Sequence, residues 1–112
     1  MIHVLDRKTS EDEIREMLEE LGSYIKLAVD VRLGVLAGGG AMHSDCESAL
    51  LQQGSLQENI WGADWVPVTG EIRFDSVINI RPRQGNRSMT IQDPQVRTRV
   101  ESVIRQVFGA SK

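Results

Sequence analysis

The stretch INIRPRQGNRSMTIQDP, residues 78–94, contains the side chains best suited to bind an anionic ligand. Asn79 and Arg81 share one face of a predicted strand, and the Gly85–Asn86 pair contains two residue types that tolerate a positive φ. A turn at this pair brings guanidinium, amide and hydroxyl groups toward one point, and arginine forms charge-assisted bonds with phosphates and carboxylates. We therefore predict a ligand-binding loop that contains Asn79, Arg81, Gln84, Asn86, Arg87 and Ser88.

The charge distribution leaves a second interpretation open for these arginines. Residues 1–56 contain five Lys and Arg but ten Asp and Glu, whereas residues 57–112 contain eight and six. The arginines could therefore pair with Asp30, Asp45 or Glu47 and lock the loop without binding a ligand. The formal net charge of −3 disfavours a long nucleic acid as a partner, whereas a small anionic ligand fits the local excess of arginine.

A second group of candidates lies in GGGAMHSDCE, residues 38–47, where a glycine run enters a predicted helix. Such a loop suggests a phosphate cradle, but acids in the first helical turn occupy the positive end of the helix and repel a phosphate. Imidazole and carboxylate groups suit acid–base chemistry or a divalent metal instead, and the candidates are His43, Asp45, Glu47 and Asp30. The alternative is a capping box of Ser44 and Glu47 beside a surface histidine. The sequence identifies no cofactor.

A third candidate is the segment GSLQENIWGADW, residues 54–65. A planar ligand could stack on Trp61 while Gln57 binds its edge through hydrogen bonds. The alternative is structural, because Trp61 and Trp65 alternate on one face of a strand, and large rings at that spacing usually cover a sheet or pack under a helix.

The elements that position these residues are visible in the hydrophobic periodicity. Apolar residues at helical spacing and capping signals predict helices over 11–21, 45–53 and 94–108. Alternating patterns predict two hairpins, over 24–37 and 59–81. The order αββαββα predicts a single α+β domain over 1–112, with an antiparallel sheet formed by the two hairpins and covered by helices. We expect the glycine loop with His43, the Gln57–Trp61 segment and the Arg81–Ser88 loop to border one pocket.

Length and composition fit this architecture. A chain of 112 residues with 40% hydrophobic residues can bury one modest core. The single Cys46 cannot form an internal disulfide, which suits a reducing compartment. With no charged-then-apolar leader and no apolar run near the ~20 residues of a membrane span, the sequence predicts a soluble, cytoplasmic protein with no membrane partner.

Three stretches in this order, LAGGGAMHSDCE, GSLQENIWG and INIRPRQGNRS followed by DP, carry a family resemblance. From about residue 22 to residue 108 the chain resembles an uncharacterised family of small prokaryotic proteins, defined as a domain of unknown function. The resemblance implies a cytoplasmic protein of bacteria or archaea and supplies no activity, cofactor or substrate. The positions that match the family pattern are Arg81, Pro82, Gln84, Asn86, Arg87 and Ser88. Relatives differ at Arg83, which implies a smaller role for that residue.

Three classes of function remain. The first is a binding module for a small anionic or nucleotide-like ligand at the Arg81–Ser88 loop, and the sequence favours it. The second is a metal-assisted hydrolase or phosphoryl-handling enzyme that uses His43, Asp45 or Glu47 beside Arg81 and Arg87. The third is a protein-binding or homo-oligomeric interaction module, for example a homodimer, that uses an exposed hairpin edge or the tryptophan face. The sequence does not decide whether the protein is an enzyme.

Overall fold

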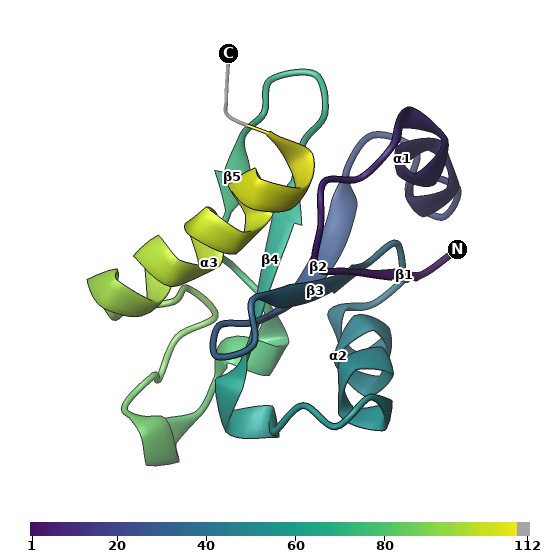
Figure 1. Ribbon diagram of the computed structural model, residues 1–112. Helices are drawn as coiled ribbons and strands as arrows, with labels where there is room; N and C mark the ends of the chain where they lie inside the picture. The colour runs from purple at the N-terminus through teal and green to yellow at the C-terminus, as the bar shows by residue number, and fades with distance from the viewer. Residues whose placement is uncertain (110–112) are drawn as a thin grey trace.

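A computed structural model describes residues 1–109. Five strands form one antiparallel sheet in the order β1-β3-β2-β4-β5 (Figure 1). The strands are β1 (His3–Leu5), β2 (Ile25–Asp30), β3 (Val35–Gly38), β4 (Ile60–Trp65) and β5 (Ile72–Arg73). The helices are α1 (Glu11–Met17), α2 (His43–Gln52) and α3 (Pro94–Phe108), and three short 3₁₀ turns lie at Gln57–Asn59, Val77–Asn79 and Pro82–Gln84. The predicted single α+β domain with an antiparallel sheet is confirmed.

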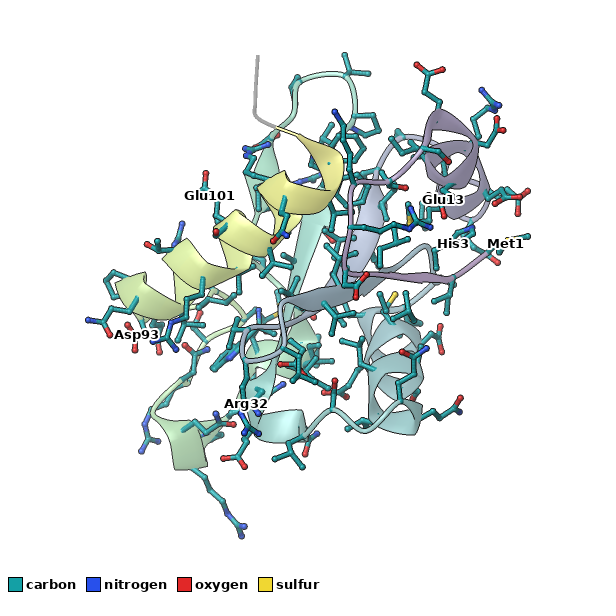
Figure 2. All side chains as sticks on the ribbon, viewed as in Figure 1. Met1, His3, Glu13, Arg32, Asp93 and Glu101 are labelled. Carbon is teal, nitrogen blue, oxygen red and sulfur yellow. The ribbon has the colours of Figure 1, made fainter. Side chains whose placement is uncertain are left out.

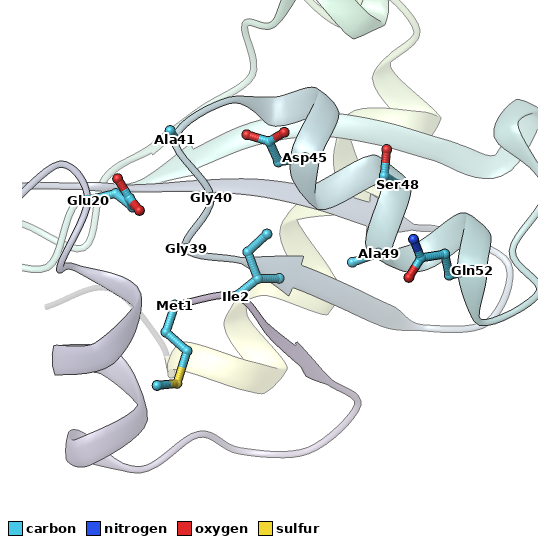
Figure 3. A pocket seen from close by; sticks show the side chains of 10 residues that line it. All are labelled: Met1, Ile2, Glu20, Gly39, Gly40, Ala41, Asp45, Ser48, Ala49 and Gln52. Atoms are coloured by element: carbon cyan, nitrogen blue, oxygen red, sulfur yellow. The ribbon is translucent and has the colours of Figure 1, made fainter.

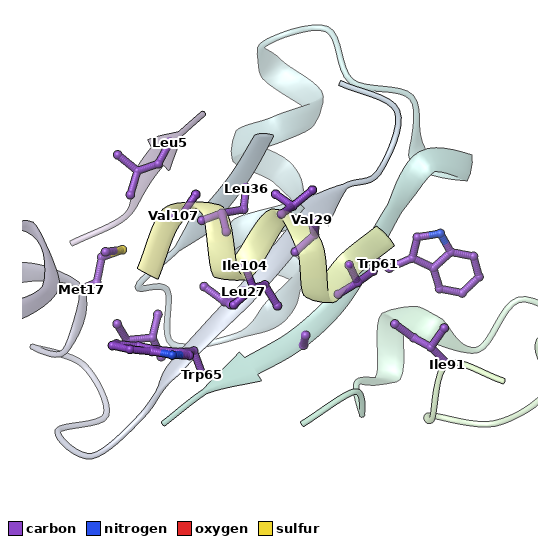
Figure 4. Close-up of a cluster of buried hydrophobic side chains, with 14 residues drawn as sticks. Leu5, Met17, Leu27, Val29, Leu36, Trp61, Trp65, Ile91, Ile104 and Val107 are labelled. Atoms are coloured by element: carbon purple, nitrogen blue, oxygen red, sulfur yellow. The ribbon is translucent and has the colours of Figure 1, made fainter. Parts of the chain in front are cut away.

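The two faces of the sheet bury separate hydrophobic clusters. The larger cluster lies under α1 and α3, where Ile25, Leu27 and Val29 of β2 meet Val100 and Ile104 of α3 (Figure 4). The smaller cluster lies under α2 and contains Ala28, Ala37, Cys46, Leu50 and Ile60. This division follows from the alternation along β2, because successive side chains of a strand point to opposite faces.

Helix boundaries agree with the sequence where a strong local cap exists. The predicted capping box of Ser10 and Glu13 starts α1, although the regular helix ends at Met17 and continues only as turns. Asp93 caps α3 by accepting a hydrogen bond from the Gln95 amide. The predicted Ser44–Glu47 box does not form.

Helix α2 begins at His43, two residues earlier than predicted. Its N-cap is Met42, whose backbone N–H donates to the carboxylate of Asp45 at 3.1 Å. The side chain of Glu47 therefore does not cap the helix, and it lies beside Arg81 instead.

The predicted second hairpin is wrong beyond Arg73. β5 has only two residues, and the chain then turns so that Phe74 and Ser76 pair with Ile91 and Met89. The outer edge of β4 at Gly62 is covered by the side-chain amide of Asn79 instead of a strand. The segment lies so close to β4 that a Cβ on Gly62 would be 2.5 Å from the Cβ of Ser76. This close contact explains why residue 62 is a glycine.

An N-terminal strand that the sequence did not predict completes the sheet. β1 pairs with β3, and Nε2 of its His3, which is labelled in Figure 2, donates to the carboxylate of Glu16 in α1 at 2.8 Å. Three residues are too few for a visible alternation, so pairing with β3 decides the conformation. Among residues 1–109, no helix is long and apolar enough to cross a membrane.

Candidate functional site: a groove between helix α2 and residues 77–84

A groove of about 490 Å³ lies between α2 and the segment that follows β5. One wall is Glu47 of α2, and Gln57 from the turn after α2 forms one end. The opposite wall consists of Val77, Ile78, Ile80, Arg81, Pro82, Arg83 and Gln84. Of the three parts that the sequence expected to border one pocket, Gln57 and residues 81–84 line this groove, whereas the glycine loop and His43 line other hollows.

Arg81 is held in place by acceptors of the protein itself. Its Nε donates to the carbonyl of Ile78 at 3.0 Å, and Nη1 donates to the carbonyl of Gln57 at 2.7 Å. Nη2 donates to the carbonyl of Ile60. The guanidinium thus connects two backbone segments, residues 57–60 and residue 78, and these carbonyls occupy donors that a ligand would otherwise use.

Glu47 is the acid that pairs with Arg81, as the alternative interpretation of the arginines anticipated. Glu47 Oε2 lies 3.5 Å from Arg81 Nη2, and the two side chains are only 12% and 10% exposed. Burial lowers the pKa of Arg81, and the carboxylate of Glu47 partly offsets this effect. The pair is nearly excluded from solvent, so its attraction is weakly screened.

The carboxylate of Glu47 is nevertheless short of hydrogen bonds. Oε2 is buried and has no hydrogen-bond partner, and Oε1 makes no hydrogen bond to any residue that the structure describes. The guanidinium of Arg81, 3.5 Å away, offsets the burial of Oε2. Oε1 is therefore the acceptor that Glu47 leaves open at the groove.

Trp61 lies beside the groove but does not offer an open ring face. Its side chain is buried at 5% exposure, and the guanidinium carbon of Arg81 lies 4.8 Å from the ring centroid. Figure 4 shows the ring at the opposite end of the large cluster from Trp65, which stacks on Phe108 at 4.2 Å. Both rings therefore pack as the structural alternative anticipated.

Three other side chains of the groove keep polar groups near the surface. Gln84 donates from Nε2 to the carbonyl of Glu58 at 2.9 Å, which ties the loop to the turn at 57–59. Gln57 and Arg83 are exposed. These groups form the polar rim of the groove.

The remaining residues of the predicted binding loop lie outside the groove. Asn79 and Asn86 are buried at 0% and 4% exposure, and their amides bind backbone groups. Ser88 accepts a hydrogen bond from the Thr90 amide. The side chain of Arg87 is exposed and does not line the groove. The structure thus separates Arg87 from Arg81, although the sequence placed them together.

His43 lies one helical turn before Glu47 and borders a smaller hollow. Its Nε2 lies 2.8 Å from Oδ1 of Asp64 and 3.0 Å from the carbonyl of Ala63. Sequence analysis missed Asp64, because its partner is 21 positions away. No signal in the sequence indicates this pair, because it depends on the packing of α2 against β4.

The other proposed acid–base or metal ligands do not join His43. Asp45 caps α2 and lines a separate pocket beside Gly39 and Gly40 (Figure 3). Asp30 is buried and accepts a hydrogen bond from Ser55 at 2.6 Å. Among residues 1–109, no group of three or more His, Cys, Asp and Glu side chains is arranged to hold a metal ion.

The glycine run has a packing explanation. Gly39 has a φ of +106°, and a Cβ there would lie 2.2 Å from the carbonyl oxygen of Met1. Burial raises the pKa of the neighbouring Cys46 thiol, which keeps this side chain protonated inside the core. Glycines here allow β1, α1 and α2 to approach one another.

These features define a small α+β domain with a polar groove at one edge of its sheet. The chain belongs to the family described as "Protein of unknown function (DUF5674)", which matches residues 3–107. No curated protein and no solved structure gives a significant match.

Proposed function

We propose that the protein is a binding module for a small nucleotide-like ligand and that the groove between α2 and residues 77–84 is its site. The observation that carries the proposal is Oε1 of the Glu47 carboxylate, which lines the groove and accepts no hydrogen bond from the described residues. A ligand that supplies N–H groups would bind this oxygen while Oε2 stays beside Arg81 Nη2.

The shape of the acceptor favours one type of ligand edge. The accessible carboxylate oxygen has two acceptor sites, and a guanine-type edge presents two adjacent N–H donors. An adenine edge presents one amino group beside an acceptor nitrogen, which would face the carboxylate unfavourably. We therefore expect guanine nucleotides to bind more tightly than adenine nucleotides.

The rest of the groove supports the same ligand class. The apolar side chains of Ile80 and Pro82 offer a surface for a flat ring, and Gln57 supplies an amide at the end of the groove. The exposed guanidinium of Arg83 is placed to meet an anionic group such as a phosphate. This assignment moves the anionic contact from Arg81 and Arg87 to Arg83.

The test is an NMR titration of the protein with GMP, AMP and ribose 5-phosphate. We expect saturable shifts of Glu47, Gln57 and residues 77–84 with GMP and much weaker binding of the other two. Glu47→Gln keeps the side-chain size but loses the negative charge of the acceptor, and it should weaken GMP binding by about 10- to 100-fold, as loss of charged hydrogen bonds typically does.

Two matched variants provide controls. Glu58→Gln removes a neighbouring charge that does not line the groove and should leave GMP binding unchanged. Arg83→Gln should weaken GMP binding, whereas Arg87→Gln should not. Equal affinity for the three ligands, or a flat response to all of them, would refute the proposal. A flat response together with a concentration-dependent dimer would favour the interaction module.

We also propose a cytoplasmic location. Cys46 is a free, buried thiol, and such a side chain suits a reducing compartment. Fractionation of cells that express the tagged protein would test this location.

A further inference from the structure

The His43 hollow adjoins the groove and has a different chemical character. It measures about 220 Å³ and is lined by Lys26, Met42, His43, Ser44, Ser76, Val77 and Ile78. Val77 and Ile78 also belong to the groove, so they form the partition between the two sites. Most of the surface is apolar, with a few polar groups at one side.

The hydrogen bonds of His43 determine its tautomer. Nε2 lies within hydrogen-bond distance of the Ala63 carbonyl and the Asp64 carboxylate, and neither a carbonyl nor an ionised carboxylate can donate. Nε2 must therefore carry the proton. In the neutral ring Nδ1 then has an open lone pair, and no residue that the structure describes donates to it.

Donors on the same hollow complement this acceptor. Lys26 uses one N–H on the carbonyl of Ala41 at 3.1 Å and keeps two others. Ser76 is 4% exposed, and its oxygen accepts from the Ile78 amide at 3.2 Å. Its O–H proton has no acceptor among the described residues. The hollow thus offers one acceptor and two donors around an apolar space.

We propose that the His43 hollow binds the hydroxyl group of a small phenol or alcohol. The hydroxyl would donate to His43 Nδ1 and accept from Lys26 or Ser76, while the carbon frame packs on Met42, Val77 and Ile78. A hydroxyl matches this set because it is both a donor and an acceptor. Asp64 is a positioning residue, since it fixes the tautomer and does not line the hollow.

A matched set of probes tests the proposal: phenol, anisole and toluene. Phenol can donate and accept, anisole can only accept, and toluene can do neither. We expect phenol to shift the amide signals of residues 43–44 and 76–78 and to bind about tenfold more tightly than anisole or toluene, as expected for one well-placed hydrogen bond. Equal binding of the three probes, or no binding of phenol, would overturn the proposal.

Two variants separate recognition from folding. His43→Lys can still donate toward Asp64 but carries no acceptor, so phenol binding should be lost while the amide spectrum elsewhere is preserved. Asp64→Asn leaves the Ala63 carbonyl as an acceptor, so the ring ¹⁵N shifts of His43 should keep the Nε2–H pattern while phenol binds more weakly because the ring is held less firmly. An Nδ1–H pattern in the wild-type protein would contradict the inference directly.

Discussion

Replacing Asn79 by alanine tests the contact that takes the place of a long fifth strand. The Asn79 side chain is fully buried and bonds both backbone groups of Gly62, accepting from its N–H at 2.7 Å and donating to its carbonyl at 2.9 Å. It also donates to the carbonyls of Met89 and Phe74. This amide therefore performs the hydrogen bonding of a strand residue on the edge of β4.

The expected loss follows from the groups left without partners. The carbonyls of Met89 and Phe74 retain hydrogen bonds from the amides of Ser76 and Ile91. The N–H and carbonyl of Gly62 lose theirs, and each buried unpaired group costs about 1–3 kcal/mol. Because water can enter the small cavity, we expect Asn79→Ala to lower the free energy of unfolding by about 3 kcal/mol.

Urea unfolding followed by circular dichroism measures this difference. Asn59→Ala is the control, since its side-chain amide makes no hydrogen bond to the described residues, and it should change the free energy by less than about 0.5 kcal/mol. Asn79→Asp keeps the acceptor for the Gly62 amide but places an oxygen against the Gly62 carbonyl, and it should be as harmful as alanine. A loss below about 1 kcal/mol for Asn79→Ala would refute the assignment, because two orphaned groups cost more than that.

Three further predictions concern packing, charge and pH. Gly62→Ala places a methyl group against Ser76 and should destabilise the fold by about 1–3 kcal/mol in the same urea assay. Arg81→Lys cannot bridge three carbonyls and should lower stability by about 1–3 kcal/mol, whereas an unchanged unfolding midpoint would show that one ammonium contact suffices. The hydrogen bond from Arg7 holds the pKa of Glu13 well below its usual range, with the Ser10 amide as the next cause. Because the pKa of Glu13 is lowered in the folded state, this stabilisation is present at neutral pH and is lost as the pH falls toward the folded pKa. The difference in melting temperature between wild type and Glu13→Gln should therefore become smaller at pH values below the ordinary pKa range of a carboxyl group.

Local signals in the sequence account for the parts of the fold that were predicted. Asp93 followed by Pro94 marks the start of α3, and its apolar stripe gives the helix its full predicted length. The alternation in residues 24–31 identifies β2 because both faces of that strand are buried by different layers. In each case, the residues that decide the structure are close together in the sequence.

Long-range contacts decide the parts that were not predicted. Residues 71–81 alternate like a strand, but the amide of Asn79 binds Gly62 across 17 positions and turns the chain away. Long-range contacts also decide which residues of the site could be predicted. The Arg81–Glu47 pair was foreseen as one of several pairings, whereas the His43–Asp64 pair depends on the packing of α2 against β4.

The early end of β5 is what creates the groove. A continued strand would have paired with β4 beyond Gly62 and directed alternate side chains to the two faces of the sheet. Instead the side chain of Asn79 forms hydrogen bonds with the backbone of Gly62, and Arg81 donates a hydrogen bond to the carbonyl of Ile60 on the same strand. The guanidinium is thereby held next to α2, where the early start of that helix has released Glu47 from capping. Asn79→Ala should therefore weaken GMP binding even under conditions where the variant remains folded, because the bond to Gly62 positions the residues from Val77 to Gln84 that line the groove.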